Sequence, residues 1–185
     1  MQEGKNKFQP DSKTFDRETL TLLLHINKST FDLGNLPDLA EKNGFDEKSE
    51  YHITVLGFKT GEKIQQALEH LTDQQKEEKI SEIQSLVDAT DWSYVLKPEK
   101  YHITKHYPKK DDNQIENKRE SYIQMVRVSG IDGFFKKLNE LLKTSIEVQP
   151  AHITLYTSGN EEHATRGIGI NSPAEFEQLD TQPIK

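Results

Sequence analysis

The chain has 185 residues, enough for one domain or two small packed lobes that bury a core without disulfide bonds. Its formal net charge of −7 and pI near 5.5 lack the global basic surface of proteins that grip long nucleic acid, whereas a short or single nucleotide remains compatible. The absence of cysteine excludes disulfides, thiolate metal sites and cysteine nucleophiles.

The sequence carries no recognisable membrane or signal segment. Residues 1–13 are polar and lack the apolar core of a signal peptide. No apolar run approaches the roughly 18–20 residues of a spanning helix. We therefore expect a cytoplasmic protein without membrane association. We also expect a monomer, although no sequence pattern bears on the oligomeric state.

The chain begins with a polar lead-in, residues 1–16. Strict alternation of leucine and isoleucine with other residues predicts a strand over 18–27. A short helix is expected at 36–42, and a second strand at 50–58. In that second strand Ile53 lies on the face opposite the histidine and threonine on either side of it.

Apolar residues at helical spacing predict helix over 61–88. Thr72 and Gln75 have capping-box spacing, which predicts a break near residue 72. Residues 92–107 are expected to be extended. The charged stretch 108–120 is typical of an exposed loop.

The last third of the chain repeats the mixture of strand and helix. A strand is expected at 121–128, followed by a helix over 133–144 that Asp132 caps. A further strand is expected at 146–157, and a short closing strand at 166–171.

The order of elements defines an α+β protein whose two halves look alike. Each half offers an amphipathic helix and a strand bearing a His-x-Thr segment. We expect one domain over 17–172, followed by a C-terminal tail over 173–185.

The tripeptide His-Ile-Thr occurs three times, at 52–54, 102–104 and 152–154. Strand alternation points histidine and threonine to one side, with Cα atoms about 6–7 Å apart, and isoleucine to the other. Two such strands side by side would present two imidazoles and two hydroxyls to one phosphate. Histidine suits proton transfer near neutral pH, and threonine can donate to the phosphate oxygens as charge develops.

A single His-x-Thr segment is weak evidence, because threonine and isoleucine favour strands and a surface histidine is ordinary. The copies at residues 52–54 and 152–154 have matching strand contexts. The middle copy differs, because lysine-rich residues surround it. His102 and His106 stand four residues apart, but the proline-ended extended segment disfavours a helical zinc pair.

The segments YHITVLGF, 51–58, and AHITLYTSG, 151–159, resemble the 2H phosphoesterase superfamily. That superfamily includes the RNA 2',3'-cyclic phosphodiesterases once called 2'-5' RNA ligases. The resemblance covers roughly residues 15–172. It implies a bilobal fold of two mixed or antiparallel sheets with pseudo-two-fold symmetry and a central groove.

The resemblance also implies the activity and the catalytic residues. It assigns catalysis to His52, Thr54, His152 and Thr154. It implies a metal-independent phosphodiesterase without cofactor, acting on 2',3'-cyclic or 2'-5' phosphodiesters of RNA ends or small nucleotides, with reverse ligation as a related activity. A binding module of the same fold that does not cleave its ligand is the alternative. A metal-dependent hydrolase ranks last, because the nearby carboxylates lack ligand spacing.

Substrate-binding residues are harder to assign from the sequence. The family often carries a basic residue shortly after the second threonine, where this chain has Leu155-Tyr156-Thr157. Arg166 or Arg127 could replace that residue. We expect substrate contacts from a small set of further residues: Tyr156, Phe58, Arg166 and His102. Lys105, Arg127 and Arg166 are candidate phosphate clamps, although a lone basic residue is usually solvated.

Overall fold

The computed structural model describes residues 6–107, 117–158 and 167–184. Eight strands are found there: β1 Ser12–Asp16, β2 Thr21–Ile26, β3 Asp46–Glu47, β4 Tyr51–Leu56, β5 Tyr94–Tyr107, β6 Asn117–Val128, β7 His152–Ser158 and β8 Asp180–Pro183. They form one sheet in the order β1-β2-β4-β7-β6-β5-β8, with β3 paired to β7 beside this path. Every registered pair of strands is antiparallel.

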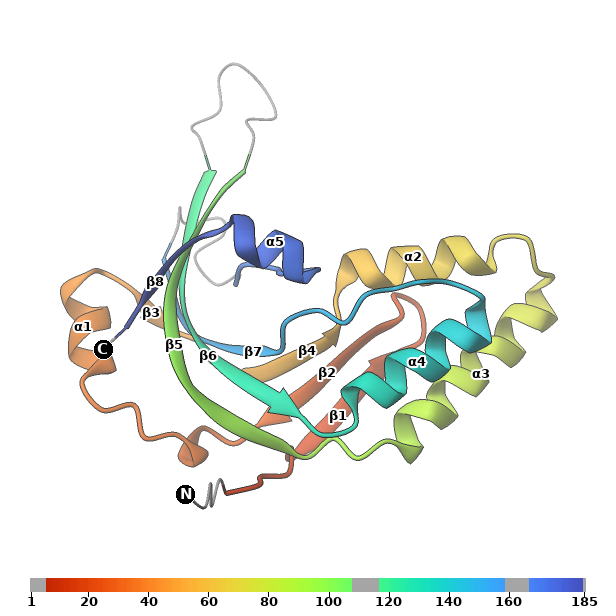
Figure 1. Cartoon of the computed structure of the whole chain (residues 1–185), viewed down its shortest axis with the longest axis horizontal. Coiled ribbons are helices and arrows are strands. Elements are labelled where there is room, and N and C mark those ends of the chain that lie inside the picture. Colours follow the sequence, from red (N-terminus) through yellow and green to blue (C-terminus); the bar gives the residue numbers. More distant parts are fainter. Residues whose placement is uncertain (1–5, 108–116, 159–166, 185) are drawn as a thin grey trace.

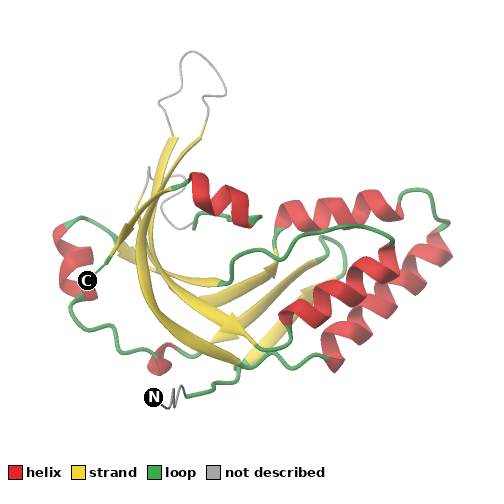
Figure 2. Cartoon of the chain, viewed as in Figure 1, coloured by secondary structure: helices red, strands yellow, loops and turns green. Residues whose placement is uncertain are grey.

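The α-helices of the described residues are α1 Leu36–Lys42, α2 Phe58–Leu68, α3 Asp73–Ala89, α4 Ile131–Leu142 and α5 Pro173–Gln178; a 3₁₀ helix covers Lys28–Thr30. Figure 1 shows α2, α3 and α4 gathered at one end of the molecule, while β5, β6 and β8 curve around the other. Figure 2 shows that α5 lies apart from the group, inside the curve of the strands. No helix among the described residues is long and apolar enough to cross a bilayer.

The two halves of the sheet meet where β4 lies beside β7. The registered pair at this seam is Ile53 with Ile153, and both side chains are fully buried. Three strands, β1, β2 and β4, lie on one side of the seam, and the longer β6 and β5 follow β7 on the other. The seam therefore joins the middles of the two predicted His-Ile-Thr strands.

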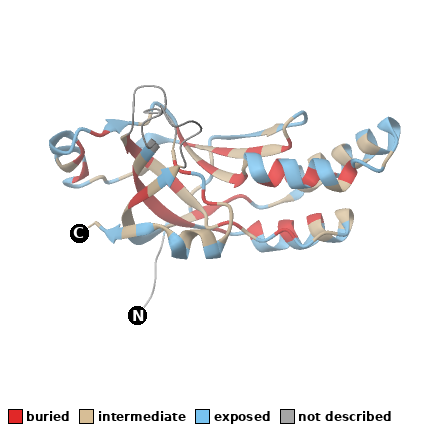
Figure 3. Ribbon diagram, turned by 90° about the horizontal axis from the view of Figure 1, so that it is seen from above, coloured by how far each residue is buried: buried red, intermediate tan, exposed pale blue. Residues whose placement is uncertain are grey.

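Each face of the sheet has its own core. We call the face with Ile53 and Ile153 the core face; its buried side chains form one large cluster with those of α1 to α4. We call the opposite face, which carries His52, Thr54, His152 and Thr154, the motif face. A smaller cluster lies there, composed of Ile103, Ile123, Met125, Ile168 and Ile170. Figure 3 shows the buried residues concentrated along the strands and on one side of the helices.

Several sequence predictions hold. Helix α1 covers residues 36–42, and the long helical region divides into α2 and α3. The Thr72 side chain accepts from the Gln75 backbone and the Gln75 side chain accepts from the Thr72 backbone, which is the predicted capping box. The α+β class is confirmed.

Other boundaries differ from prediction. The strands form one sheet rather than two, because β4 and β7 pair across the seam. Strand β1 lies inside the predicted polar lead-in, and β6 begins within the predicted loop. The predicted strand over 146–157 begins only at residue 152, because Pro150 precedes it and has no N–H to donate.

Helix α4 begins at Ile131, so Gly130 occupies the N-cap position that was predicted for Asp132. The predicted closing strand over 166–171 is wrong for its described part, since 167–170 forms no strand. The predicted tail folds as α5 and β8, and β8 pairs with β5. A hydrophobic contact anchors it, because Phe176 and Leu179 pack against the smaller cluster.

Candidate active site

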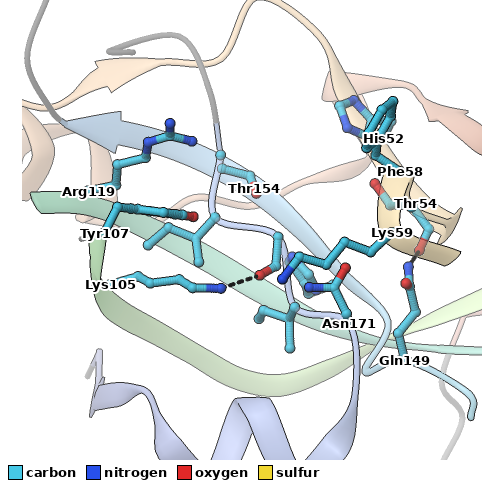
Figure 4. Close-up of a pocket in the computed structure, with 16 residues that line it drawn as sticks. His52, Thr54, Phe58, Lys59, Lys105, Tyr107, Arg119, Gln149, Thr154 and Asn171 are labelled. Atoms are coloured by element: carbon cyan, nitrogen blue, oxygen red, sulfur yellow. Dashed lines mark hydrogen bonds between the residues drawn. The ribbon is translucent and has the colours of Figure 1, made fainter. Parts of the chain in front are cut away.

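Four side chains from the first and last His-Ile-Thr segments line one pocket. The pocket has a volume of about 520 Å³, and His52, Thr54, His152 and Thr154 are among its sixteen lining residues. Figure 4 shows His52 and Thr54 on one side of the cavity and Thr154 on another. A cavity of this size falls in the range of small-ligand sites.

The register of the seam explains this convergence. Since Ile53 pairs with Ile153 between antiparallel strands, His52 lies beside Thr154 and Thr54 lies beside His152. Side chains directly opposite one another have Cβ atoms roughly 4.5–5.5 Å apart, and diagonal neighbours are roughly 7–8 Å apart. Both imidazoles therefore come within reach of a group the size of a phosphate.

His52 lies among groups that disfavour its protonation. Its register partner on β2 is His25, whose Nε2 lies 2.9 Å from Thr14 Oγ1. Burial lowers the pKa of His52, and the charges of Lys48, His25 and His152 lower it further, while the charge of Glu50 opposes the shift. The neutral imidazole, which accepts a proton, is therefore the favoured form.

His152 is held by the backbone just before its strand. Its Nδ1 lies 2.8 Å from the Pro150 carbonyl oxygen. A carbonyl can only accept, so this contact assigns a proton to Nδ1. Burial lowers the pKa of His152, while the carbonyls of Pro150 and Ile168 oppose that shift. The contact with Pro150 therefore fixes the orientation of the His152 ring.

The pocket is cationic in a protein that is acidic overall. Lys59, Lys105 and Arg119 line it, and none of its sixteen lining residues is an aspartate or glutamate. The full chain carries a net charge of −7. This local reversal of sign, together with two histidines, favours an anionic ligand.

The rim beside His52 is the beginning of α2. Gly57, Phe58 and Lys59 line the pocket there. Gly57 is the N-cap residue and supplies no side-chain cap, so the first helical N–H groups gain no partner from it. Phe58 is the large apolar side chain that stands exposed among the described residues, with 65% of its surface accessible. Phe58 was predicted to contact the substrate. Its position in the pocket is compatible with that prediction, which stays a prediction.

The segment after residue 166 covers part of the motif face. A Cβ on Gly167 would lie 3.0 Å from Thr154 Oγ1, so the backbone approaches that threonine closely. Glu175 anchors the segment, because it pairs with Lys105 and accepts from the Asn171 backbone at 2.8 Å. Burial alone would raise the pKa of Glu175, yet hydrogen bonds from Lys105 and Asn171 hold it at about 2.

Gln149 links the segment just before β7 to β4 by a hydrogen bond. Its Nε2 donates to the Thr54 carbonyl oxygen at 2.6 Å. Its Oε1 is buried and has no hydrogen-bond partner, although the residue lines the pocket. A buried acceptor without a partner is costly, so this oxygen can receive a hydrogen bond from a ligand or water.

Tyr156 does not reach the pocket, contrary to prediction. The β6–β7 register pairs Ile123 with Thr154 but Tyr122 with Tyr156, so residue 155 is an extra residue in β7. This bulge reverses the alternation beyond Thr154. Tyr156 therefore points to the core face, where it is 5% exposed and contacts Tyr122 edge-on.

His102 also lies on the core face, so its predicted substrate contact in this pocket is corrected. It pairs in register with Tyr122, and its ring contacts those of Phe45 and Tyr122. Its Nε2 lies 3.1 Å from Glu120 Oε1. The third His-Ile-Thr segment is thus turned the opposite way from the other two.

Of the candidate phosphate clamps, Lys105 and Arg127 lie among the described residues. Lys105 lines the pocket, whereas Arg127 does not. Arg166 lies outside the described residues. Four further residues line the pocket that no sequence pattern indicated: Lys59, Tyr107, Arg119 and Gln149. The polar stretch around Arg119 hides the strand alternation that would have indicated its face.

Within the part of the chain that the structure describes, no three histidine, aspartate or glutamate side chains converge as metal ligands do. Comparison with known proteins finds no matching family model, no matching curated protein and no matching solved structure.

Proposed function

We propose that this protein is a metal-independent phosphodiesterase that opens 2',3'-cyclic or 2'-5' phosphodiesters of RNA ends or small nucleotides. The observation that carries the proposal is the Ile53–Ile153 register, which brings two His-Ile-Thr segments to one cationic pocket. The resemblance of these segments to the 2H phosphoesterase superfamily supports it. Membership in that superfamily, with two lobes related by a pseudo-two-fold axis, is part of the proposal.

The reaction needs one proton acceptor and one proton donor across a phosphate. A neutral histidine removes a proton from water while the water oxygen bonds to phosphorus. The bond from phosphorus to one ribose oxygen breaks, and a protonated histidine gives that oxygen its proton. Thr54 and Thr154 donate to the non-bridging oxygens, which gain charge as the fifth bond forms.

The surroundings of the two histidines suggest which role each takes. Burial, and then the charges of Lys48 and His25, favour the neutral form of His52 against the opposing charge of Glu50, which suits the base. The carbonyls of Pro150 and Ile168 face His152 and favour its protonated form against the effect of burial. We therefore assign His52 as the general base and His152 as the general acid.

The experiment incubates the purified protein with nucleoside 2',3'-cyclic phosphates and with a 2'-5' dinucleotide, in the presence of EDTA. The proposal predicts hydrolysis, with one monophosphate regioisomer formed from each cyclic substrate and detected by chromatography. A single regioisomer is expected because only one ribose oxygen faces the acid. Activity that appears only after a divalent metal is added would contradict the proposal.

The same experiment separates an enzyme from a binding module. Calorimetry on the cyclic phosphates runs in parallel with the product assay. Tight binding without product after prolonged incubation would assign the pocket to binding and remove the catalytic roles of His52 and His152.

A further inference from the structure

The wall of the pocket built by the β5–β6 pair carries two cations and an aromatic ring. Lys105 pairs with Arg119 in register, and Tyr107 lies two residues beyond Lys105 on the same strand face. All three line the pocket. Figure 4 shows these three side chains together, apart from His52 and Phe58.

Arg119 has hydrogen-bonding capacity that the described residues leave unused. Its guanidinium carbon lies 4.4 Å from the centre of the Tyr107 ring, which orients the planar group. Its Nε is buried and has no hydrogen-bond partner. A buried donor without a partner is costly, so the site gains when an acceptor arrives.

The charge of the neighbouring cation, Lys105, is already balanced by a carboxylate. Lys105 forms an ion pair with Glu175 and donates to the Gly169 carbonyl oxygen at 3.3 Å. Both members of the ion pair are mostly buried, with side-chain exposures of 20% and 22%. Arg119 is therefore the better candidate on this wall for binding an anionic group.

Arg119 lies far enough from Thr154 to contact a different part of a bound ligand. It lies four positions along β6 from Ile123, the register partner of Thr154. Four strand steps correspond to about 13 Å between Cα atoms. A phosphate held between His52 and His152 leaves the outer part of the pocket, where Arg119 and Tyr107 stand, for another portion of the same ligand.

We propose that Arg119, oriented by Tyr107, binds a second phosphoryl group of the substrate. This deepens the proposed function and rests on it. The substrate class is then a nucleotide that carries one phosphate beside the reacting one. Two sources supply that chemistry: a 5'-phosphorylated mononucleotide, or the end of an oligonucleotide with its neighbouring phosphodiester. Arg119 offers paired N–H groups that match the oxygens of either.

The test measures the affinity of product analogues by calorimetry, so that it does not depend on turnover. The probes are adenosine 2'- and 3'-monophosphate, the matching 2',5'- and 3',5'-bisphosphates, and adenosine dinucleotides that end in a 2'- or a 3'-phosphate. The wild-type protein should bind at least one kind of probe with a second phosphoryl group about tenfold or more tighter than the matching monophosphate. Which of them is preferred identifies the source of the second phosphate.

Arg119→Ala and Arg119→Gln should remove that preference and leave the affinity for the monophosphate unchanged. The glutamine variant keeps most of the side-chain stem and guards against loss of packing. Lys118→Ala is the matched control, because it removes a positive charge from the adjacent residue, which pairs with Glu120. The control should retain the preference.

Equal wild-type affinity for all probes would overturn the inference. So would an equal loss for every probe in the Arg119 variants, because Arg119 would then contact the reacting phosphate. Failure of the proposed function has a different signature: the preference and its dependence on Arg119 persist, but no cyclic phosphate is hydrolysed.

Discussion

Ile53 and Ile153 face each other across β4 and β7, and their pairing joins the two halves of the sheet. Both side chains are fully buried in the large core. Their burial fixes the opposite orientation of the flanking histidines and threonines. One apolar contact on the core face thus determines the geometry of the pocket on the motif face.

Ile153→Ala should therefore be strongly destabilising. Removing a fully buried isoleucine leaves a cavity and costs about 2–5 kcal/mol of unfolding free energy. Urea denaturation of the variant measures this cost. Ile80→Ala, which truncates a partly buried side chain on α3, is the matched control and should cost less. A loss at Ile153 no larger than that at Ile80 would show that the seam does not depend on this contact.

The assigned roles of the histidines predict different responses to the leaving group. A p-nitrophenolate leaves without being protonated, so an enzyme that lacks its general acid still cleaves such an ester. We expect His152→Ala to retain much more activity on a nucleoside p-nitrophenyl phosphate than on a cyclic phosphate. His52→Ala should lose activity on both. The reverse pattern would exchange the two roles.

The rate should depend on pH in a specific direction. The pKa values of His52 and His152 both lie below the usual 6.5, chiefly because the two rings are buried. Catalysis requires one neutral and one protonated ring, so kcat/KM is largest between the two pKa values. We expect its maximum below pH 6.5 and a fall above it, as the acid loses its proton. A pH profile of kcat/KM that peaks above pH 7.5 would contradict the assignment.

Glu175 should stabilise the fold of the segment that covers the pocket. Its pKa of about 2 in the folded protein lies below the ordinary 4.5, so its contribution is complete above pH 4.5 and declines as pH falls toward 2. Glu175→Gln should cost on the order of 2–3 kcal/mol at pH 7 and much less at pH 3. Chemical denaturation at the two pH values measures this. A cost that does not change with pH would mean that the charge of Glu175 contributes little.

Local patterns allowed much of this fold to be predicted. Alternation along residues 50–58 placed His52 and Thr54 on one face because β4 alternates regularly from Tyr51 to Thr54, before the register shift at Val55. The spacing of Thr72 and Gln75 located the break between α2 and α3, because a capping box is a contact between near neighbours. These features depend on residues close in sequence.

Features that depend on distant pairing could not be predicted in this way. The bulge at residue 155 reversed Tyr156, and it arises from the register with β6. His102 has the same tripeptide as His52 but faces the other side, because the face of a strand is set by its partners. Strand β8 is short and polar, and only its pairing with β5 defines it.

The most direct test of the account compares three alanine variants of the three His-Ile-Thr segments in EDTA. His52→Ala and His152→Ala should each lower kcat/KM on the preferred cyclic phosphate by about 10²-fold or more, because each removes a proton-transfer group. His102→Ala, from the segment that faces the core, should stay within about threefold of the wild type. Near-normal activity in either of the first two variants, or an equal loss in His102→Ala, would contradict the account.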